Sequence, residues 1–304
     1  MNAENGVKKT GGKEGKSLFQ KKMNRKQENQ LRAWIRFGVQ LIFFLFFASA
    51  YNAAFAAVKY VMTQMGMSKP LEWTSFISIL LVLCLYTMVF GRFFCGFACA
   101  FGSMGDWLHS IYVFLCKKRI KKAHKIPAKF ALPLSKLKYL ILLLILFLCF
   151  RNQYTKLQGT SPWDVFSRVY AGQLNLSGFW IGILVLCLIM AGMFFEERFF
   201  CRFLCPMGAI FSLLPVLPHF SLQRDRENCI KGCSACERTC PCGIGLPEDK
   251  SLMVEGECFQ CQKCQGVCPK KHIHTGTKGL KGNEIWFTAL RAGFLLVLFI
   301  LLDV

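Results

Sequence analysis

Cysteines carry most of the chemistry that this sequence could perform. The 304-residue chain has 17 of them, and most stand in short, closely spaced groups. The clearest group is residues 258–269, CFQCQKCQGVCP, an unbroken C-x2-C-x2-C-x3-C-P run. Three thiolates on a tight loop can cap one face of a cubane, and this spacing is a ligand pattern for a [4Fe–4S] cluster. The run therefore predicts an iron–sulfur site.

A second run lies upstream, where residues 229–241 read CIKGCSACERTCP, with one additional residue between the first two cysteines. In proteins with two such runs, the fourth cysteine of each ligates the cluster of the other. We therefore expect one cluster on Cys229, Cys233, Cys236 and Cys268, and a second on Cys258, Cys261, Cys264 and Cys240. Cys242 is an alternative to Cys240, and paired zinc sites are the alternative to clusters.

Two further cysteine pairs belong to a repeat of another kind. RFFCGFACAFG begins at Arg92 and RFFCRFLCPMG begins at Arg198. Three interpretations stay open for Cys95, Cys99, Cys201 and Cys205. They converge on a further metal or cluster, they act as redox-active dithiols beside arginines, or they are small apolar residues that pack against phenylalanines.

Long apolar stretches must position these cysteines. The mean hydropathy is +0.37 and 54% of the residues are hydrophobic. Five stretches are near the length that crosses a hydrocarbon core of about 30 Å, namely Phe37–Ala57, Thr74–Phe90, Pro133–Phe150, Phe179–Phe195 and Ile285–Val304. The third is long enough only if Lys136 and Lys138 extend to the membrane surface. We expect an all-α integral membrane protein with about five transmembrane helices.

The order of these stretches predicts two hairpins, each of which leads into one RFFC repeat. Both hairpins begin and end on the same side, so they would be parallel repeats about an axis along the membrane normal, which brings the cysteine pairs together. Lysine and arginine concentrate in residues 1–30 and 116–138. Because basic residues tend to stay inside, we expect a multi-pass protein of the inner membrane with its N-terminus and cysteine runs in the cytoplasm.

Composition divides the chain into four parts. Residues 1–30 are expected to form a basic flexible tail, 31–217 a four-helix membrane region, 218–282 a small cytoplasmic two-cluster ferredoxin domain of α+β type, and 283–304 a last membrane helix. The ferredoxin domain is poor in aliphatic residues, so its clusters would supply much of its folding free energy. The net charge of +21 lies beside the predicted helices, which favours anionic lipid headgroups over nucleic acid as the partner.

Four motifs together resemble one family. They are the G-R-x-F-C-G-aromatic-x-C block at Gly91–Cys99, the R-F-x-C-R-x-x-C-P-x-G block at Arg198–Gly208, and the two cysteine runs. Over residues 31–304 the chain resembles the NapH-type membrane polyferredoxins, which are related to the membrane parts of NosR and to CcoG/FixG proteins. It departs from their pattern at Ala100, where proline is usual, and in the lengthened Cys229–Cys233 spacing.

The resemblance implies a membrane electron carrier rather than a hydrolase or nucleotide-binding enzyme. Such a protein would relay electrons between the quinone pool or a soluble donor and a partner reductase, with no catalytic residue of its own. Two alternatives stay open, a CcoG-like copper reductase or assembly factor and a redox-sensing or anchoring subunit. Possible quinone or proton groups are Asp106, Trp107 and His109, just after the first repeat, and Asp164 with Trp163 in an outer loop. The alternative for each of them is an ordinary interface residue.

Overall fold

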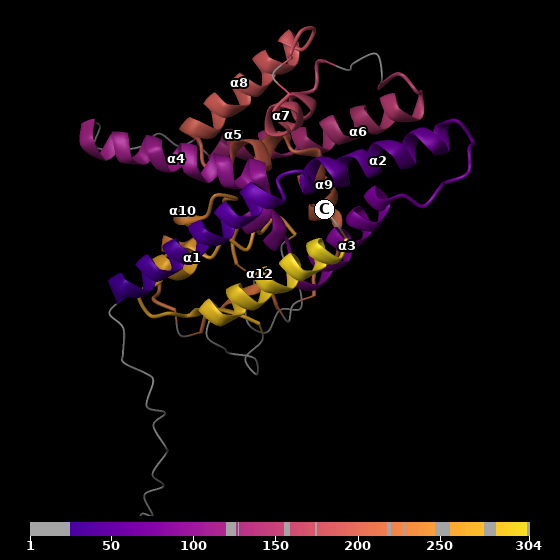
Figure 1. Ribbon diagram of the computed structural model, residues 1–304. Helices are drawn as coiled ribbons and strands as arrows, with labels where there is room; N and C mark the ends of the chain where they lie inside the picture. The colour runs from indigo at the N-terminus through magenta and orange to yellow at the C-terminus, as the bar shows by residue number, and fades with distance from the viewer. Residues whose placement is uncertain are drawn as a thin grey trace, which may run out of the picture.

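The structure is a computed structural model that describes residues 25–119, 126, 128–154, 159–173, 175–217, 220–227, 229–246, 256–276 and 284–302. The fold is mostly helical (Figure 1). Of the predicted flexible tail, residues 1–30, the first 24 lie outside the described residues. Helix α1 (Arg25–Phe46) begins before the Leu31 boundary that we expected, so the end of the predicted tail is helical.

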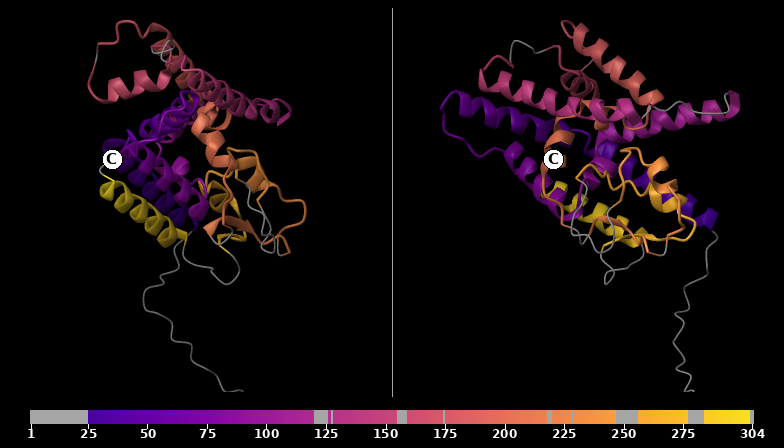
Figure 2. Two further views of the ribbon diagram at one scale, coloured as in Figure 1. Left: turned by 90° about the vertical axis from the view of Figure 1, so that its right-hand side faces the viewer. Right: turned by 180° about the vertical axis from the view of Figure 1, so that it is seen from behind.

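The membrane region consists of two series of helices, each interrupted by a π-helical turn. The first series is α1, α2 (Ala50–Gly66), α3 (Ser75–Phe90), the π-turn η1 (Phe94–Ala98) and α4 (Ala100–Arg119). The second is α5 (Ala128–Ser135), α6 (Leu137–Phe150), α7 (Pro162–Tyr170), α8 (Trp180–Phe195), the π-turn η3 (Phe200–Leu204) and α9 (Pro206–Leu213). Figures 1 and 2 show α4, α6, α7 and α8 on one side of the molecule and α1, α3 and α12 (Glu284–Leu301) on the other, with α2 between them.

Large apolar side chains cover the outside of these helices. On α12, Trp286, Leu290, Phe294 and Val297 recur every three or four residues and are each about half or more exposed. This pattern places one apolar face outward along the helix, and α6 and α8 carry similar exposed faces. Exposed apolar surface on this scale is characteristic of contact with lipid, so the apolar helices indicate a membrane protein.

Fewer described helices qualify as spans than we predicted. By length and composition, Pro133–Phe150 and Glu284–Leu301 could each cross a membrane, while α3 and α8 are apolar but shorter. The predicted span over Phe37–Ala57 is not one continuous helix, because α1 and α2 meet there at a bend of 58°, and the two qualify as a span only together. Phe47 packs on Phe299 of α12, whereas Tyr51 packs on Phe101 of α4, so the two arms of the bend contact different neighbours.

The two helical series are not packed in the same way. In the described residues α2 packs along α3, as a hairpin requires, but α6 packs mainly on α2 and α9, and α8 on α4 and α7. An apolar cavity of about 390 Å³, lined by Ile141 of α6, Trp163 of α7 and Ile189 of α8, lies between these elements. The second predicted hairpin therefore differs from the first.

A small α+β unit carries the cysteine runs. Strands β1 (Leu222–Arg224) and β2 (Ile273–Thr275) pair in antiparallel fashion, with Gln223 opposite His274, and helices α10 (Ala235–Thr239) and α11 (Lys263–Val267) pack on each other. Its core is a minor cluster around Leu222 and Ile273 that includes cysteines of both runs. By contrast, Phe259 is buried in the main core of the membrane region, so the unit is anchored to the helices.

Candidate functional site

The first predicted ligand set surrounds a single cavity. Cys229, Cys233, Cys236 and Cys268 all line it, so the fourth cysteine of the downstream run lies with the first three of the upstream run. Arg224 of β1 donates from Nη1 to the Sγ atom of Cys236 at 3.2 Å, while its buried Nε has no hydrogen-bond partner among the described residues. This arrangement places an unused donor beside four thiols.

The second predicted set is also brought together. The thiol of Cys264 at α11 interacts electrostatically with Cys258, Cys261 and Cys240. Gln260 and Gln262 between these cysteines have left-handed backbone with φ of 54° and 60°, a conformation that is uncommon for residues other than glycine. Such turns aim successive N–H groups inward, and the N–H of Gln260 donates to Cys258.

Cys240 and Cys242 both lie beside this second set. A hydrogen bond from the Cys242 thiol, followed by backbone N–H groups from residues 242–244, lowers the pKa of Cys240 to about 6 despite its burial. Burial raises the pKa of Cys242, whose Sγ atom also lies 3.0 Å from the carbonyl oxygen of Glu257, an alternative acceptor for its single S–H hydrogen. Cys242 also interacts with Cys258 and Cys261, so our assignment of the ligand to Cys240 stays a prediction.

The four repeat cysteines meet inside the membrane region. Cys95, Cys99, Cys201 and Cys205 are 4–7% exposed, and every pair among their thiols interacts electrostatically. The departure at Ala100 has little effect on the turn, because Cys99 (φ −69°, ψ 127°) and Cys205 (φ −72°, ψ 113°) have nearly the same backbone. Each is followed at once by a helix, α4 or α9. We refer to these residues as the cysteine quartet.

The arginines that open the two repeats hold the ferredoxin unit. Arg92 and Arg198 are fully buried, and their guanidinium carbons lie 4.6 Å and 5.6 Å from the centroid of the Phe259 ring. Arg198 also donates to the carbonyl oxygens of Cys95 and Gly96 in the other repeat. Phe259 lies directly after Cys258, so this contact joins the second ligand set to the cysteine quartet.

A partly buried ion-pair group strengthens the same junction. Glu257 accepts hydrogen bonds from Lys138 at 2.6 and 2.5 Å, from Arg92 at 3.2 Å and from Tyr139 at 2.8 Å. Burial acts to raise the pKa of Glu257, but Arg92 and Lys138 hold it below its ordinary value. Our expectation that Lys138 extends to the membrane surface is wrong, because its side chain is fully buried against this carboxylate.

A second carboxylate fixes helix α4 to both α1 and the second repeat. Asp106 accepts from Arg198 at 2.8 and 2.5 Å, from Arg36 at 2.5 Å and from Gln40 at 2.7 Å. Burial acts to raise the pKa of Asp106, but Arg198 and then Arg36 hold it well below its usual range. Its paired charges make Asp106 a structural anchor.

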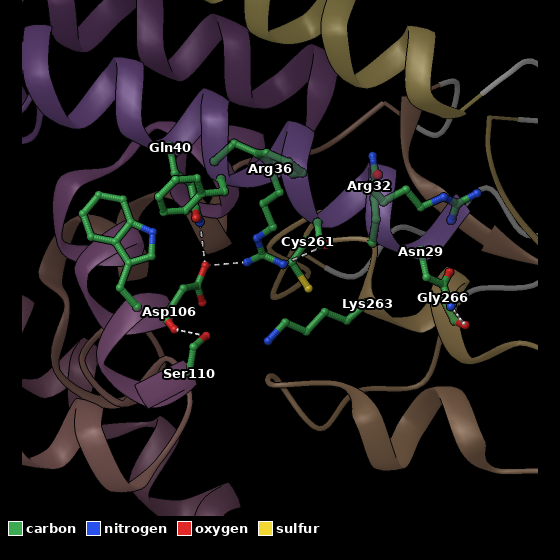
Figure 3. Close-up of a pocket in the computed structure, with 14 residues that line it drawn as sticks. Asn29, Arg32, Arg36, Gln40, Asp106, Ser110, Cys261, Lys263 and Gly266 are labelled. Carbon is green, nitrogen blue, oxygen red and sulfur yellow. Dashed lines mark hydrogen bonds and ion pairs between the residues drawn. The ribbon is translucent and has the colours of Figure 1, made fainter. Parts of the chain in front are cut away.

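A pocket of about 310 Å³ opens beside this anchor (Figure 3). Arg36 and Gln40 of α1 point toward Asp106, and Arg36 also donates to the carbonyl oxygen of Cys261 at 3.1 Å. Trp107 lines the pocket too, and its buried indole Nε1 has no hydrogen-bond partner among the described residues. The pocket therefore connects a cysteine of the second set with the residues that we named as candidates for quinone contact.

Several residues of the junction were not found from the sequence. Glu257 and Phe259 flank Cys258 without any spacing signal, and their partners are distant in the chain. A signal did exist for Arg92 and Arg198, since both stand at the same place in a repeated motif. We interpreted them only as neighbours of the thiols, whereas they also bind the ferredoxin unit.

Comparisons with known proteins agree with this geometry. A family described as "4Fe-4S binding domain" matches residues 72–122 and 178–223, the segments that contain both RFFC repeats. The uncharacterized protein MJ0749 of Methanocaldococcus jannaschii is 31% identical over 59% of this chain and 62% of its own length. The ferredoxin-type protein NapH of Haemophilus influenzae is 26% identical over 65% of this chain and 67% of its own length.

The regulatory protein NosR of Pseudomonas aeruginosa is 25% identical over 74% of this chain, which spans only 31% of NosR. The chain thus covers less than two thirds of MJ0749 and of NosR. No solved structure matches it. The cysteine runs, the matched 4Fe–4S segments and the named relatives together support a similarity to the NapH-type 4Fe–4S membrane ferredoxins.

Proposed function

We propose that this protein relays single electrons through two [4Fe–4S] clusters in its ferredoxin unit, between the quinone pool or a soluble donor and a partner reductase. Cys229, Cys233, Cys236 and Cys268 would hold one cluster, and Cys258, Cys261, Cys264 and Cys240 the other. A general electron-transfer role follows from the family and from relatives named ferredoxin-type proteins. The two-cluster relay goes further and is our proposal.

Buried arginine nitrogens without acceptors support this proposal. Arg224, which also pairs with Glu237 at 3.3 Å, lies beside the first set, and Arg291 of α12 interacts with Cys258 of the second. Both have buried side-chain nitrogens without a hydrogen-bond partner among the described residues. A buried donor without an acceptor is costly, and the sulfur atoms of a cluster would accept these hydrogen bonds. The clusters supply the electron levels, and the arginines would help to tune their potentials.

The pocket beside Cys261 is where we propose that a quinone headgroup or another small electron carrier meets the second cluster. Its volume of about 310 Å³ is within the range of small-molecule sites. Phe37, Phe97 and Trp107 give it aromatic walls, while Arg36 and Gln40 bring hydrogen-bond donors to the same space. This combination suits a flat ring with polar oxygens.

We further propose an inner-membrane location with five crossings and the ferredoxin unit in the cytoplasm. The concentration of Lys and Arg in residues 1–30 and 116–138 supports this orientation. A reducing cytoplasm also suits cysteines that bind metal rather than form disulfides. Partner redox subunits would then approach the ferredoxin unit from the cytoplasmic side.

Metal analysis and rapid kinetics of the full chain test this function. Protein purified anaerobically in detergent should contain iron and sulfide, show reduced-cluster EPR signals after dithionite, and be reoxidised quickly by a soluble quinone analogue. Trp107→Leu should slow reoxidation by the quinone, with Trp73→Leu, an exposed tryptophan in the segment before α3, as control. A preparation dominated by zinc would contradict the clusters, and slow quinone reoxidation that inhibitors leave unchanged would contradict the relay.

A further inference from the structure

A polar trough lies between α2 and α7. It consists of two adjoining cavities of about 300 and 520 Å³, which share Lys59, Asp164 and Ser167 and have no lining residue in common with the pocket beside Cys261. From its charges, its aromatic walls and its position we infer that this α2–α7 trough binds the phosphate group of a membrane phospholipid. The inference goes beyond the proposed relay, which uses none of these residues.

Two cations line the larger cavity, Lys59 of α2 and Arg168 of α7. The Nζ atom of Lys59 lies 5.0 Å and 4.8 Å from the ring centroids of Phe55 and Tyr154. The guanidinium carbon of Arg168 lies 4.5 Å from the ring centroid of Phe179. Neither cation forms an ion pair with an acidic side chain among the described residues. Both are therefore free to pair with an anion, and lysine and arginine are the usual side-chain donors to phosphate oxygens.

The charges of the trough match one phosphodiester. Lys59 and Arg168 are positive and Asp164 is negative, which leaves one net positive charge, and the phosphodiester of a phospholipid carries one negative charge. Asp164 can in addition accept a hydrogen bond from a headgroup hydroxyl or amine. A neutral quinone would leave the positive charge unbalanced, so the charges favour a phospholipid at this site.

An amide group without partners gives independent evidence for a ligand. Asn52 of α2 lines the smaller cavity, and both its Nδ2 and its Oδ1 atoms are buried without a hydrogen-bond partner among the described residues. Burial of unsatisfied polar atoms is costly. A ligand with phosphate or ester oxygens in this cavity would accept a hydrogen bond from Nδ2 and reduce that cost.

Exposed tryptophans place the trough near a membrane surface. Trp73, just before α3, is 73% exposed, and Trp180, at the start of α8, is 75% exposed. Tryptophan is enriched where a membrane meets water. Phe179 of the larger cavity directly precedes Trp180, and Phe76 of the smaller cavity lies in the first turn of α3. The trough is therefore at the level of phospholipid headgroups.

An apolar cavity next to the trough suits an acyl chain. Trp163 lines both the smaller cavity of the trough and the apolar cavity of about 390 Å³, where Ile141 and Leu188 also lie. Trp163 donates from Nε1 to the hydroxyl group of Tyr51 at 2.7 Å, and that hydroxyl group lies 3.6 Å from the Sγ atom of Cys205. A bound phospholipid would thus contact a tryptophan that is connected to the cysteine quartet.

Lipid binding by the full chain, purified in detergent and depleted of lipid, tests the inference. Short-chain phosphatidylglycerol should be retained in native mass spectrometry and should raise the melting temperature, because a ligand of the folded state stabilises it. Lys59→Gln/Arg168→Gln should bind about tenfold more weakly or worse, since two charged hydrogen-bond donors are lost. Lys69→Gln/Arg151→Gln, which removes the same charge from exposed positions outside the trough, should bind as the wild type does. Equal binding by the two double variants would overturn the site.

Other ligands decide which group is recognised. Diacylglycerol with the same chains, inorganic phosphate and a soluble quinone analogue should each change the melting temperature of the wild type and of Lys59→Gln/Arg168→Gln equally. Stabilisation by any of them that this variant loses would assign the trough to that ligand and overturn the phospholipid.

Further variants keep the test decisive. If the double variant does not accumulate, Asn52→Leu takes its place and should also weaken lipid binding, and unchanged binding would then overturn the inference. The trough variants should keep the iron content and EPR signals of the wild type, so failure of the lipid site would leave the relay standing. Loss of iron from the wild type would contradict the relay without affecting the lipid site.

Discussion

At the scale of single residues, buried arginines beside the cysteines have the clearest chemical consequence. Arg224 donates to the Sγ atom of Cys236 at 3.2 Å. Hydrogen bonds to ligand sulfur and nearby positive charge favour the more negative, reduced form of a cluster. Arg224→Gln should therefore lower the reduction potential of one cluster, measured by EPR-monitored redox titration. Arg226→Gln, an exposed residue on the same loop, should leave all potentials unchanged, and an equal shift in both variants would refute this role.

Glu257 is the acidic partner of two buried cations, Lys138 and Arg92. Breaking a fully buried ion pair costs about 3–5 kcal/mol, and because the Glu257 side chain is 35% exposed, we expect Glu257→Gln to cost about 2 kcal/mol. Thermal unfolding in detergent measures this change, with the exposed Glu72→Gln as control. A loss no larger than that of the control would show that the pair does not stabilise the junction.

The pKa of Glu257 gives this stabilisation a pH dependence. Its folded-state pKa is lowered by Arg92 and Lys138, so the carboxylate binds protons more weakly in the folded protein than in the unfolded one. The contribution is complete above the unfolded pKa of about 4.3 and is lost as the pH falls through the folded value. The difference in melting temperature between wild type and Glu257→Gln should therefore be constant near neutral pH and shrink below about pH 4. A difference that persists in acid would assign the effect to packing.

At the scale of elements, the π-turn η1 must approach the ferredoxin loop without a side chain at Gly96. A Cβ atom there would lie 2.2 Å from the carbonyl oxygen of Phe259. Gly96→Ala should consequently separate the two elements and cost about 1–3 kcal/mol, as overpacked substitutions do. Gly38→Ala in α1 meets no atom within 4 Å and should be neutral or slightly stabilising. Thermal unfolding and limited proteolysis of the ferredoxin unit would show the difference, and equal behaviour of the two variants would exclude a close contact.

Some features of these elements were predictable from the sequence and others were not. The spacing within each cysteine run is a local signal, and the exchange of fourth cysteines between paired runs predicts that Cys268 lies with Cys229, where the structure has it. The bend between α1 and α2 was missed because hydropathy continues through it, and only the contacts of Phe47 and Tyr51 with different helices reveal it. Lys138 was misjudged for a similar reason, since its partner Glu257 lies 119 residues away. Long-range pairing of this kind leaves no periodic signal.

At the scale of the whole molecule, the ferredoxin unit is held by the membrane helices rather than tethered to them. Phe259 between two buried arginines, Glu257 with Lys138, and Asn29 of α1 with Gly266 bind it from three directions. Repetition in the sequence indicated that the two cysteine pairs would meet. It did not indicate that the same two repeats would also form the docking surface, because that surface depends on residues from a separate motif.

The orientation of the whole molecule in the membrane gives the last prediction. If the basic segments stay in the cytoplasm, the ferredoxin unit and the loop after α7 must lie on opposite sides. A protease site inserted after Gly245 should be cut in inverted membrane vesicles and protected in right-side-out ones, whereas a site after Gly172 should behave in the reverse manner. Both loops are exposed, so both sites should be cut in detergent, which controls for access. Cleavage of the two sites from the same side would contradict the topology.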